Sequence, residues 1–226
     1  FDFLTPDCRA GVVHRDATTV HGDAHRHILH LELVDGLHAQ LFKSHHLGFL
    51  DGFQGLVDRN VEPLHYRDVS GILTRGGTIL GASNKANPFS YHPRGGADVS
   101  AQVVNTYNNF DLDALIVIGG DGTMSIAHRL IDLGIDVVGV PKTIDNDIQF
   151  VGNSFGFETA IYQSTPVITA AHVEARSVYN GLGIVKLMGR DSGFISAYAT
   201  LANPVVNFCL IPEDHWELEG PNGLLK

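Results

Sequence analysis

The chain has 226 residues, of which 44% are hydrophobic and 18% are charged; this is typical of a folded domain and too apolar for a disordered protein. The formal net charge of −10 argues against a nucleic-acid-binding surface, because contact with a phosphate backbone requires a dense basic face. No apolar run reaches the ~18 residues that span a bilayer, and the start of the chain lacks the pattern of a signal peptide. We therefore expect a protein without membrane contact, in a reducing, cytoplasmic setting that suits its two distant cysteines.

Residues 1–46 differ in character from the rest of the chain. They hold eight of the thirteen histidines, show no clear apolar period and contain no recognised spacing of metal ligands. We interpret them as an atypical His-rich segment, either disordered or produced by a shifted reading frame, and disfavour metal binding there. The expected folded part is one α/β domain, residues 47–226.

The first recognisable elements alternate between helix and strand. Residues 102–108 predict part of a helix, and the continuous apolar run 114–118 predicts a strand covered on both faces. A glycine-rich turn follows, then apolar residues at helical spacing over 123–133, and a further strand at 136–140. This order predicts a βαβ unit with a right-handed crossover.

A second set of alternating elements begins at residue 157. Residues 157–177 are compatible with a helix, but Pro166 removes a backbone donor, so we expect a kink or break near Ser164. The repeated alternation predicts a three-layer αβα, Rossmann-like fold with a mainly parallel sheet. The remaining expected elements are a strand at 184–187, a helix at 192–201 and a strand at 206–211.

Polar sequences follow two of the expected strands, at the sheet edge where ligands of open α/β folds collect. In residues 119–123 (GGDGT), the glycines let a phosphate chain approach the backbone, the next helix offers free N–H groups, and Asp121 can hold magnesium. A tight turn with Asp121 as a helix N-cap is the simpler alternative. Residues 141–147 (PKTIDND) gather two carboxylates, a hydroxyl and a lysine, as a phosphoryl-transfer site requires, whereas a solvated Asx turn is the alternative.

Two further residues follow later strands. Arg190 stands near a predicted helix entrance, where a guanidinium can bind a phosphoryl group in bidentate fashion, although a surface ion pair is also consistent with the sequence. Glu213 could accept hydrogen bonds from sugar hydroxyls, or be an ordinary loop carboxylate.

Taken together, these segments resemble the phosphofructokinase family, and the resemblance covers residues 47–226 in the family's order. It is carried by 119–123 (GGDGT), 141–147 (PKTIDND), 155–160 (FGFETA), 187–190 (LMGR) and 210–213 (LIPE). The resemblance implies a chain that is incomplete at both ends, from an ATP-dependent 6-phosphofructokinase that forms fructose 1,6-bisphosphate. The expected partners are ATP and fructose 6-phosphate, with Mg²⁺ as cofactor and a homo-oligomer when complete.

The resemblance also implies roles for single residues. Asp145 is expected to be the base that activates the 1-hydroxyl of the sugar, with Thr143 and Asp147 assisting, and Arg190 is expected to stabilise the transferring phosphoryl group. Asp121 is the expected magnesium ligand. The expected ATP-binding residues are Gly119, Gly120, Asp121, Gly122, Thr123 and Lys85, and the expected sugar-phosphate residues are Thr143, Asp145, Met188, Gly189, Arg190 and Glu213.

Two residues bear on the phosphoryl donor. Gly122 leaves room for the phosphates of ATP, where pyrophosphate-dependent members carry an aspartate. Lys142 is frequent in the pyrophosphate enzymes, and the combination resembles the plant- and protist-type ATP-dependent branch. A pyrophosphate-dependent enzyme is therefore the nearest alternative.

Some features depart from the family pattern. Residues 1–46 lack the glycine-rich phosphate loop of the family. Asn84 stands at the position where family members carry an arginine that contacts the nucleotide, and the neighbouring Lys85 is a candidate substitute. Gly181 stands where the bacterial enzymes carry an arginine. A catalytically silent nucleotide-binding subunit is therefore a further alternative. NAD kinases and diacylglycerol kinases share the GGDG turn but lack the segment TIDND.

Overall fold

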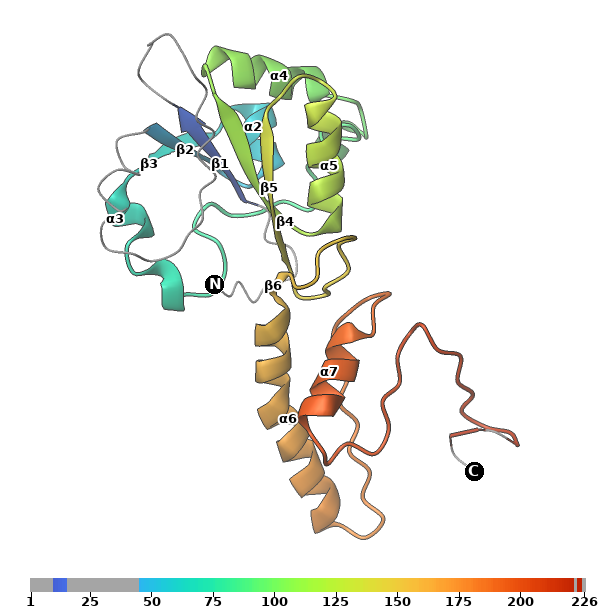
Figure 1. The fold of residues 1–226 in the computed structure, drawn as a ribbon. Coiled ribbons are helices and arrows are strands. Elements are labelled where there is room, and N and C mark those ends of the chain that lie inside the picture. Colours follow the sequence, from blue (N-terminus) through green and yellow to red (C-terminus); the bar gives the residue numbers. More distant parts are fainter. Residues whose placement is uncertain (1–9, 16–44, 222, 225–226) are drawn as a thin grey trace. The chain divides into compact units, whose positions relative to one another are not determined.

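The computed structural model describes residues 10–15, 45–221, 223 and 224. These residues belong to two compact units that meet in sequence between Val140 and Pro141 (Figure 1). Most of the His-rich segment 1–46 lies outside the described residues, so its predicted disorder or frame shift stays a prediction. Only residues 10–15, 45 and 46 of that segment are described.

A mixed sheet forms the centre of the first unit. Its strands are β1 (Ala10–Arg15), β2 (His45–Phe49), β3 (Val61–Leu64), β4 (Ala114–Gly119) and the start of β5 (Val137–Thr143), in the order β3-β2-β1-β4-β5. The pairs β2–β3, β1–β2 and β1–β4 are antiparallel. The antiparallel pairs were not predicted: two of them involve β1, which lies between β2 and β4 and for which the sequence gives no strand signal.

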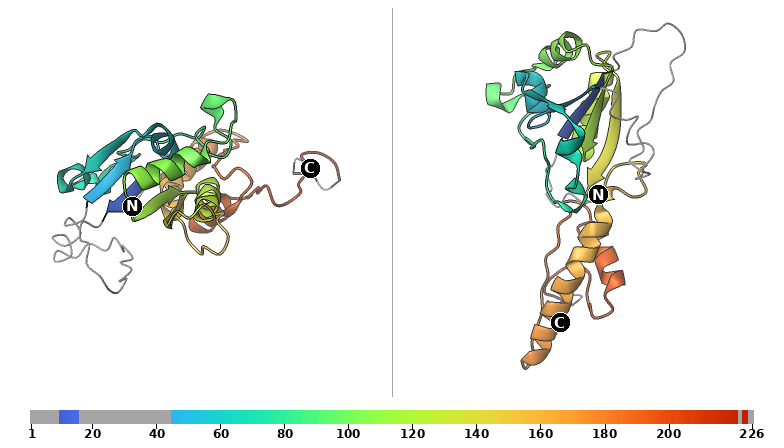
Figure 2. Two further views of the ribbon diagram at one scale, coloured as in Figure 1. Left: turned by 90° about the horizontal axis from the view of Figure 1, so that it is seen from above. Right: turned by 90° about the vertical axis from the view of Figure 1, so that its left-hand side faces the viewer.

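Three helices cover one face of this sheet. They are α2 (Phe53–Asp58), α4 (Ser100–Asn109) and α5 (Asp121–Ile131) (Figures 1 and 2). Their apolar residues join alternate residues of β4, Leu115 and Val117, in one buried cluster. The described residues of this unit thus supply two of the three predicted layers, the sheet and one layer of helices. Shorter elements are α3 (Tyr66–Val69) and the 3₁₀ turns Ile72–Thr74 and His92–Arg94.

The predicted βαβ unit is present as β4, α5 and β5. Ile126, Ala127 and Leu130 recur at helical spacing on α5 and are buried in the core. Gly134 follows the helix with φ of +85°, a left-handed conformation that glycine adopts without a steric penalty. The strand β5 runs three residues further than the sequence predicts, to Thr143.

The second unit contains two helices that pack against each other. In this unit β6 (Phe155–Gly156) pairs in parallel with the end of β5, and the chain continues directly into α6 (Phe157–Ser177). The helix α7 (Phe194–Ala202) lies beside α6 (Figure 1), and the rings of Phe157 and Tyr198 meet edge to face at 5.3 Å. The predicted helices 157–177 and 192–201 are therefore confirmed.

Of the kink or break predicted near Ser164, the break is not formed, because α6 is one helix from Phe157 to Ser177. The missing N–H of Pro166 removes the hydrogen bond to the carbonyl of Tyr162, one turn earlier. Tyr162 is exposed, so water can satisfy that carbonyl. In the preceding turn, the hydroxyl of Ser164 donates to the carbonyl of Ile161 at 2.6 Å.

The strands predicted at 184–187 and 206–211 are not formed in the described structure, and both segments are irregular. An apolar run becomes a strand only when a neighbouring strand supplies its backbone hydrogen bonds. Neither segment has such a neighbour among the described residues, and the side chains of Ile184 and Phe208 remain 82% and 69% exposed.

Among the described residues, α6 and every other helix fall short of the combined length and hydrophobicity that a bilayer crossing requires.

Candidate active site

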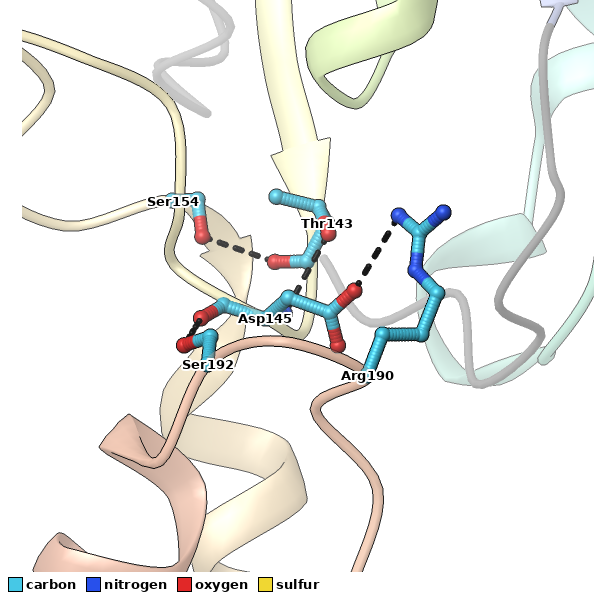
Figure 3. Close-up of polar contacts among 5 residues, drawn as sticks. All are labelled: Thr143, Asp145, Ser154, Arg190 and Ser192. Atoms are coloured by element: carbon cyan, nitrogen blue, oxygen red, sulfur yellow. Dashed lines mark hydrogen bonds and ion pairs between the residues drawn. The ribbon is translucent and has the colours of Figure 1, made fainter. Parts of the chain in front are cut away.

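The end of β5 carries a run of polar residues that are buried. Lys142, Thr143 and Asp145 are between 3% and 8% exposed. The backbone N–H of Asp145 donates to the hydroxyl of Thr143 at 3.2 Å, which turns the chain sharply after the strand (Figure 3). This burial disfavours a solvated turn here, because burying a carboxylate requires compensating partners.

The segment that returns from this loop holds it in place. The hydroxyl of Ser154 donates to the carbonyl of Thr143 at 2.7 Å, and the N–H of Ser154 donates to the side-chain oxygen of Asn146 at 2.8 Å. Asn146 has φ of +54°, a left-handed conformation that asparagine tolerates better than most residues. The loop after β5 is therefore closed by side-chain hydrogen bonds at both ends.

A tight turn brings Arg190 to Asp145. The N–H of Ser192 donates to the carbonyl of Gly189 at 2.6 Å, and Arg190 within this turn has φ of +45°. The Nη2 atom of Arg190 lies 3.4 Å from Oδ2 of Asp145, and the hydroxyl of Ser192 donates to the carbonyl of Asp145 at 2.9 Å (Figure 3). The arginine side chain is 71% exposed while that of Asp145 is 11% exposed, so the guanidinium meets the carboxylate from the solvent side.

The side chain of Glu213 binds the backbone at the start of α7. Its Oε1 atom accepts a hydrogen bond from the N–H of Gly193 at 2.8 Å, and Gly193 is the residue that precedes the helix. A negative charge is favourable at this end of a helix. A β-carbon on Gly193 would lie 2.5 Å from Ile211, so this close approach requires glycine.

A pocket opens beside this arrangement in the second unit. Three of the predicted sugar-phosphate residues line it, namely Met188, Gly189 and Arg190. Ser192, Ser196 and Pro212 also line this pocket. Asp147 is exposed within the loop that follows β5.

The first unit carries the predicted nucleotide residues at the start of α5. Gly119 ends β4, Gly120 is the N-cap residue and Asp121 is the first residue of the helix. The alternative interpretation of Asp121 as an N-cap is not supported, because Gly120 occupies the N-cap position. Gly122 is half-buried and Asp121 is exposed. The N-terminus of a helix, with its N–H groups and the positive end of its dipole, is a favourable position for an anion.

Thr123 is fully buried in the same turn. Within the described residues, its hydroxyl oxygen has no hydrogen-bond partner. Its side chain packs directly against Gly119, where a β-carbon would collide with it. An unpartnered hydroxyl in the first turn of a helix is compatible with a phosphate ligand at that helix end.

The carboxylate of Asp121 suits a metal that arrives with a phosphate. The described residues contain no group of three or more His, Cys, Asp or Glu side chains that could hold an ion by themselves. Mg²⁺ is commonly held by one or two carboxylates together with substrate phosphates and water, so one carboxylate fits. Lys85 is exposed elsewhere in this unit, and its carbonyl accepts a hydrogen bond from the N–H of His92 at 3.3 Å.

The structure groups the predicted residues within each unit. In the second unit Thr143, Asp145 and Arg190 lie together, whereas the first unit holds Lys85 and residues 119–123. Sequence reasoning missed Ser154 and Ser192, whose hydroxyls hold the loop after β5. A serine next to glycine before a helix indicates a local turn or cap, but it does not reveal which distant carbonyl the hydroxyl reaches.

Comparisons with known proteins agree on one family. A profile of the phosphofructokinase family matches residues 37–223. The chain is 46% identical over 183 residues to the ATP-dependent 6-phosphofructokinase of Borreliella burgdorferi, covering 77% of this chain and 38% of that protein. It is 42% identical over 201 residues to ATP-dependent 6-phosphofructokinase 7 of Arabidopsis thaliana, covering 86% of this chain and 39% of that protein.

Two further similarities concern the donor and the fold. The chain is 43% identical over 173 residues to a pyrophosphate–fructose 6-phosphate 1-phosphotransferase of Amycolatopsis mediterranei, covering 76% of this chain and 48% of that protein. The chain therefore spans less than half the length of each of these curated relatives. The structure also resembles phosphofructokinase of Pichia pastoris in the T-state, with a TM-score of 0.61 at 22% identity, covering 76% of this chain and 18% of that one.

Proposed function

The chain belongs to the phosphofructokinase family, and we propose that it is part of an ATP-dependent 6-phosphofructokinase acting in glycolysis. The reaction transfers the γ-phosphoryl group of MgATP to the 1-hydroxyl of fructose 6-phosphate. The observation that carries this proposal is the buried carboxylate of Asp145, held next to the guanidinium of Arg190 at the end of a sheet strand. A carboxylate that takes a proton and an arginine that meets an anion are the two groups that phosphoryl transfer to an alcohol requires.

In the proposed reaction Asp145 accepts the proton of the sugar 1-hydroxyl. The hydroxyl oxygen forms a bond to the γ-phosphorus while the bond from that phosphorus to the β,γ-bridging oxygen breaks, and ADP leaves with the electron pair. Arg190 stabilises the negative charge on the transferring group. Thr143 accepts a hydrogen bond from the backbone of Asp145, and Asp147 assists from its exposed position in the same loop. Met188, Gly189 and Glu213 belong to the proposed sugar-phosphate pocket.

The nucleotide is assigned to residues 119–123 and Lys85 of the first unit. The N–H groups at the start of α5 bind phosphate oxygens, and the buried hydroxyl of Thr123 supplies a further polar group. Asp121 is the proposed ligand of Mg²⁺, which when bound neutralises charge on the phosphates. The proposed role of Lys85, an exposed cation, is to balance phosphate charge.

ATP is the proposed donor because Gly122 adds no side chain where the phosphates approach. The second candidate donor is pyrophosphate, which the buried Lys142 and the similarity to the Amycolatopsis mediterranei enzyme favour. The complete protein is further proposed to be a homo-oligomer in the cytoplasm.

The deciding experiment measures fructose 1,6-bisphosphate formation by the full-length protein with Mg²⁺, comparing ATP with pyrophosphate. We expect turnover with ATP, and a loss of about 10²- to 10⁴-fold in kcat for Asp145→Asn, because the amide cannot accept the proton. Asp132→Asn is the matched control, since Asp132 is an exposed carboxylate after α5.

Turnover with pyrophosphate alone overturns the donor assignment. A folded protein that turns over with neither donor contradicts the proposed reaction and favours a silent nucleotide-binding subunit. Full activity in Asp145→Asn contradicts the assignment of the base.

A further inference from the structure

We propose that Ser192 is a positioning residue that sets the geometry of the Asp145–Arg190 pair. This inference rests on the proposed function, because it explains how the proposed base and the proposed phosphoryl-binding arginine are held together. It concerns a hydroxyl that makes no contact with the reacting atoms and acts through its neighbours.

One turn holds Asp145 at two different atoms. Arg190 is the second residue of the turn that begins at Gly189, and its guanidinium meets the carboxylate of Asp145 at 3.4 Å. Ser192 is the last residue of the same turn, and its hydroxyl donates to the backbone carbonyl of Asp145 at 2.9 Å (Figure 3). The separation between the base and the arginine is therefore fixed by a turn that is itself anchored to the base.

The anchor is buried, whereas the arginine side chain is exposed. Ser192 is 9% exposed and its bond to Asp145 is buried, whereas the side chain of Arg190 is 71% exposed. An exposed ion pair by itself only weakly stabilises the relative position of its two side chains, because water and salt screen it. A buried hydroxyl-to-carbonyl bond is costly to lose, because the carbonyl then lacks a partner.

The backbone of the turn adds a second constraint. Arg190 has φ of +45° and Gly189 has φ of +144°, and a β-carbon on Gly189 would collide with the carbonyl oxygen of Ser192. The turn therefore has one tightly specified shape. Because Ser192 is hydrogen-bonded to Asp145, this shape of the turn places the guanidinium of Arg190 beside the carboxylate of Asp145.

The test uses the full-length protein and three substitutions. Ser192→Ala removes the hydroxyl, and Ser192→Cys keeps a side chain of similar shape with a much weaker donor. Ser177→Ala is the matched control, because the hydroxyl of Ser177 donates to the carbonyl of Glu174 at 2.7 Å on the exposed end of α6, away from the site.

We expect kcat to fall by about 10- to 100-fold in Ser192→Ala, because a displacement of about 1 Å at a reacting centre costs this much. The KM for fructose 6-phosphate should change by less than about 3-fold, since Met188, Arg190 and Glu213 are unchanged and the pocket wall loses only the hydroxyl of Ser192. Ser192→Cys should lose at least about 5-fold in kcat. Ser177→Ala should match the wild type. In an Arg190→Lys background, Ser192→Ala should cost less than about 3-fold in kcat, because the pair that it positions is already altered.

A second measurement does not depend on activity. Amide hydrogen exchange of a peptide containing residues 144–147 should be faster in Ser192→Ala and unchanged in Ser177→Ala. If the wild type transfers no phosphoryl group, the proposed function fails, and this exchange result still decides whether Ser192 holds the Asp145 loop.

The proposal is overturned if both Ser192 variants keep kcat within about 2-fold of the wild type, or if exchange at residues 144–147 is unchanged in Ser192→Ala. It is also overturned if the loss in kcat is equally large in the Arg190→Lys background, because Ser192 then acts independently of the pair.

Discussion

The guanidinium of Arg190 lies 3.4 Å from the carboxylate of Asp145, although the two residues are separated by 45 positions in the chain. Asp145 follows the end of β5, and Arg190 lies in the tight turn before α7. The buried hydroxyls of Ser154 and Ser192 donate hydrogen bonds to two carbonyls of this segment, those of Thr143 and Asp145. This arrangement makes the contribution of each group separately measurable.

The shape of the Arg190 side chain should matter as well as its charge. We expect Arg190→Lys to lower kcat by about 10²- to 10³-fold, because a lysine ammonium is a point charge and cannot bind a phosphoryl group through two parallel N–H groups. Steady-state kinetics with ATP and fructose 6-phosphate measure the effect. Arg176→Lys, at an exposed arginine in the last turn of α6, is the matched control and should leave kcat unchanged. An unaltered kcat in Arg190→Lys would show that the planar guanidinium group is not required.

The hydroxyl of Ser154 should contribute measurably to stability. Ser154 is buried and donates to the carbonyl of Thr143, so Ser154→Ala leaves that carbonyl without its partner. We expect the free energy of unfolding to fall by about 1–3 kcal/mol. Urea unfolding measures the change, and the exposed Ser177→Ala should change the free energy by less than about 0.5 kcal/mol. Equal effects of the two substitutions would contradict the importance of burial.

Replacing Pro166 should stabilise α6. The helix continues through this residue, which has no N–H for the carbonyl of Tyr162. Pro166→Ala restores that hydrogen bond, and we expect the free energy of unfolding to rise by about 1–3 kcal/mol. Thermal and urea unfolding report the change. A loss of stability would mean that the proline ring makes packing contacts worth more than the restored bond.

Alkaline pH should destabilise the first unit through Tyr91. Burial raises the pKa of Tyr91 above its usual value, and the Asp58 carboxylate, which accepts a hydrogen bond from its hydroxyl at 3.2 Å, raises this pKa further. The folded state therefore favours the neutral phenol. This stabilisation is fully present below the pKa of the unfolded chain, about 10, and is lost as the pH rises through the higher pKa of the folded protein.

Urea unfolding at a series of pH values measures this dependence. We expect Tyr91→Phe to lose about 1 kcal/mol at neutral pH, because Asp58 loses the hydrogen bond from the phenol, and to show a shallower decline in stability above pH ~10. Tyr179→Phe is the control, since that ring is almost fully exposed. Identical pH profiles for the wild type and Tyr91→Phe would exclude Tyr91 as the source.

The sequence by itself predicted the elements whose signal is local. The β4–α5–β5 unit and α6 are found where the apolar spacing and the glycines indicate, because helix periodicity and strand–turn–helix order are written in neighbouring residues. The same local reasoning identified the polar loop after β5. It also predicted the phosphofructokinase family, which the comparisons confirm.

Only the tertiary structure decided features that depend on a distant partner. The runs 184–187 and 206–211 are apolar enough for strands, yet they stay irregular because no adjacent strand among the described residues pairs with them. The bonds from Ser154 and Ser192 to the carbonyls of Thr143 and Asp145 likewise have no signature in the sequence. A hydrogen bond across 47 positions is determined by where two loops meet in space, which neighbouring residues do not encode.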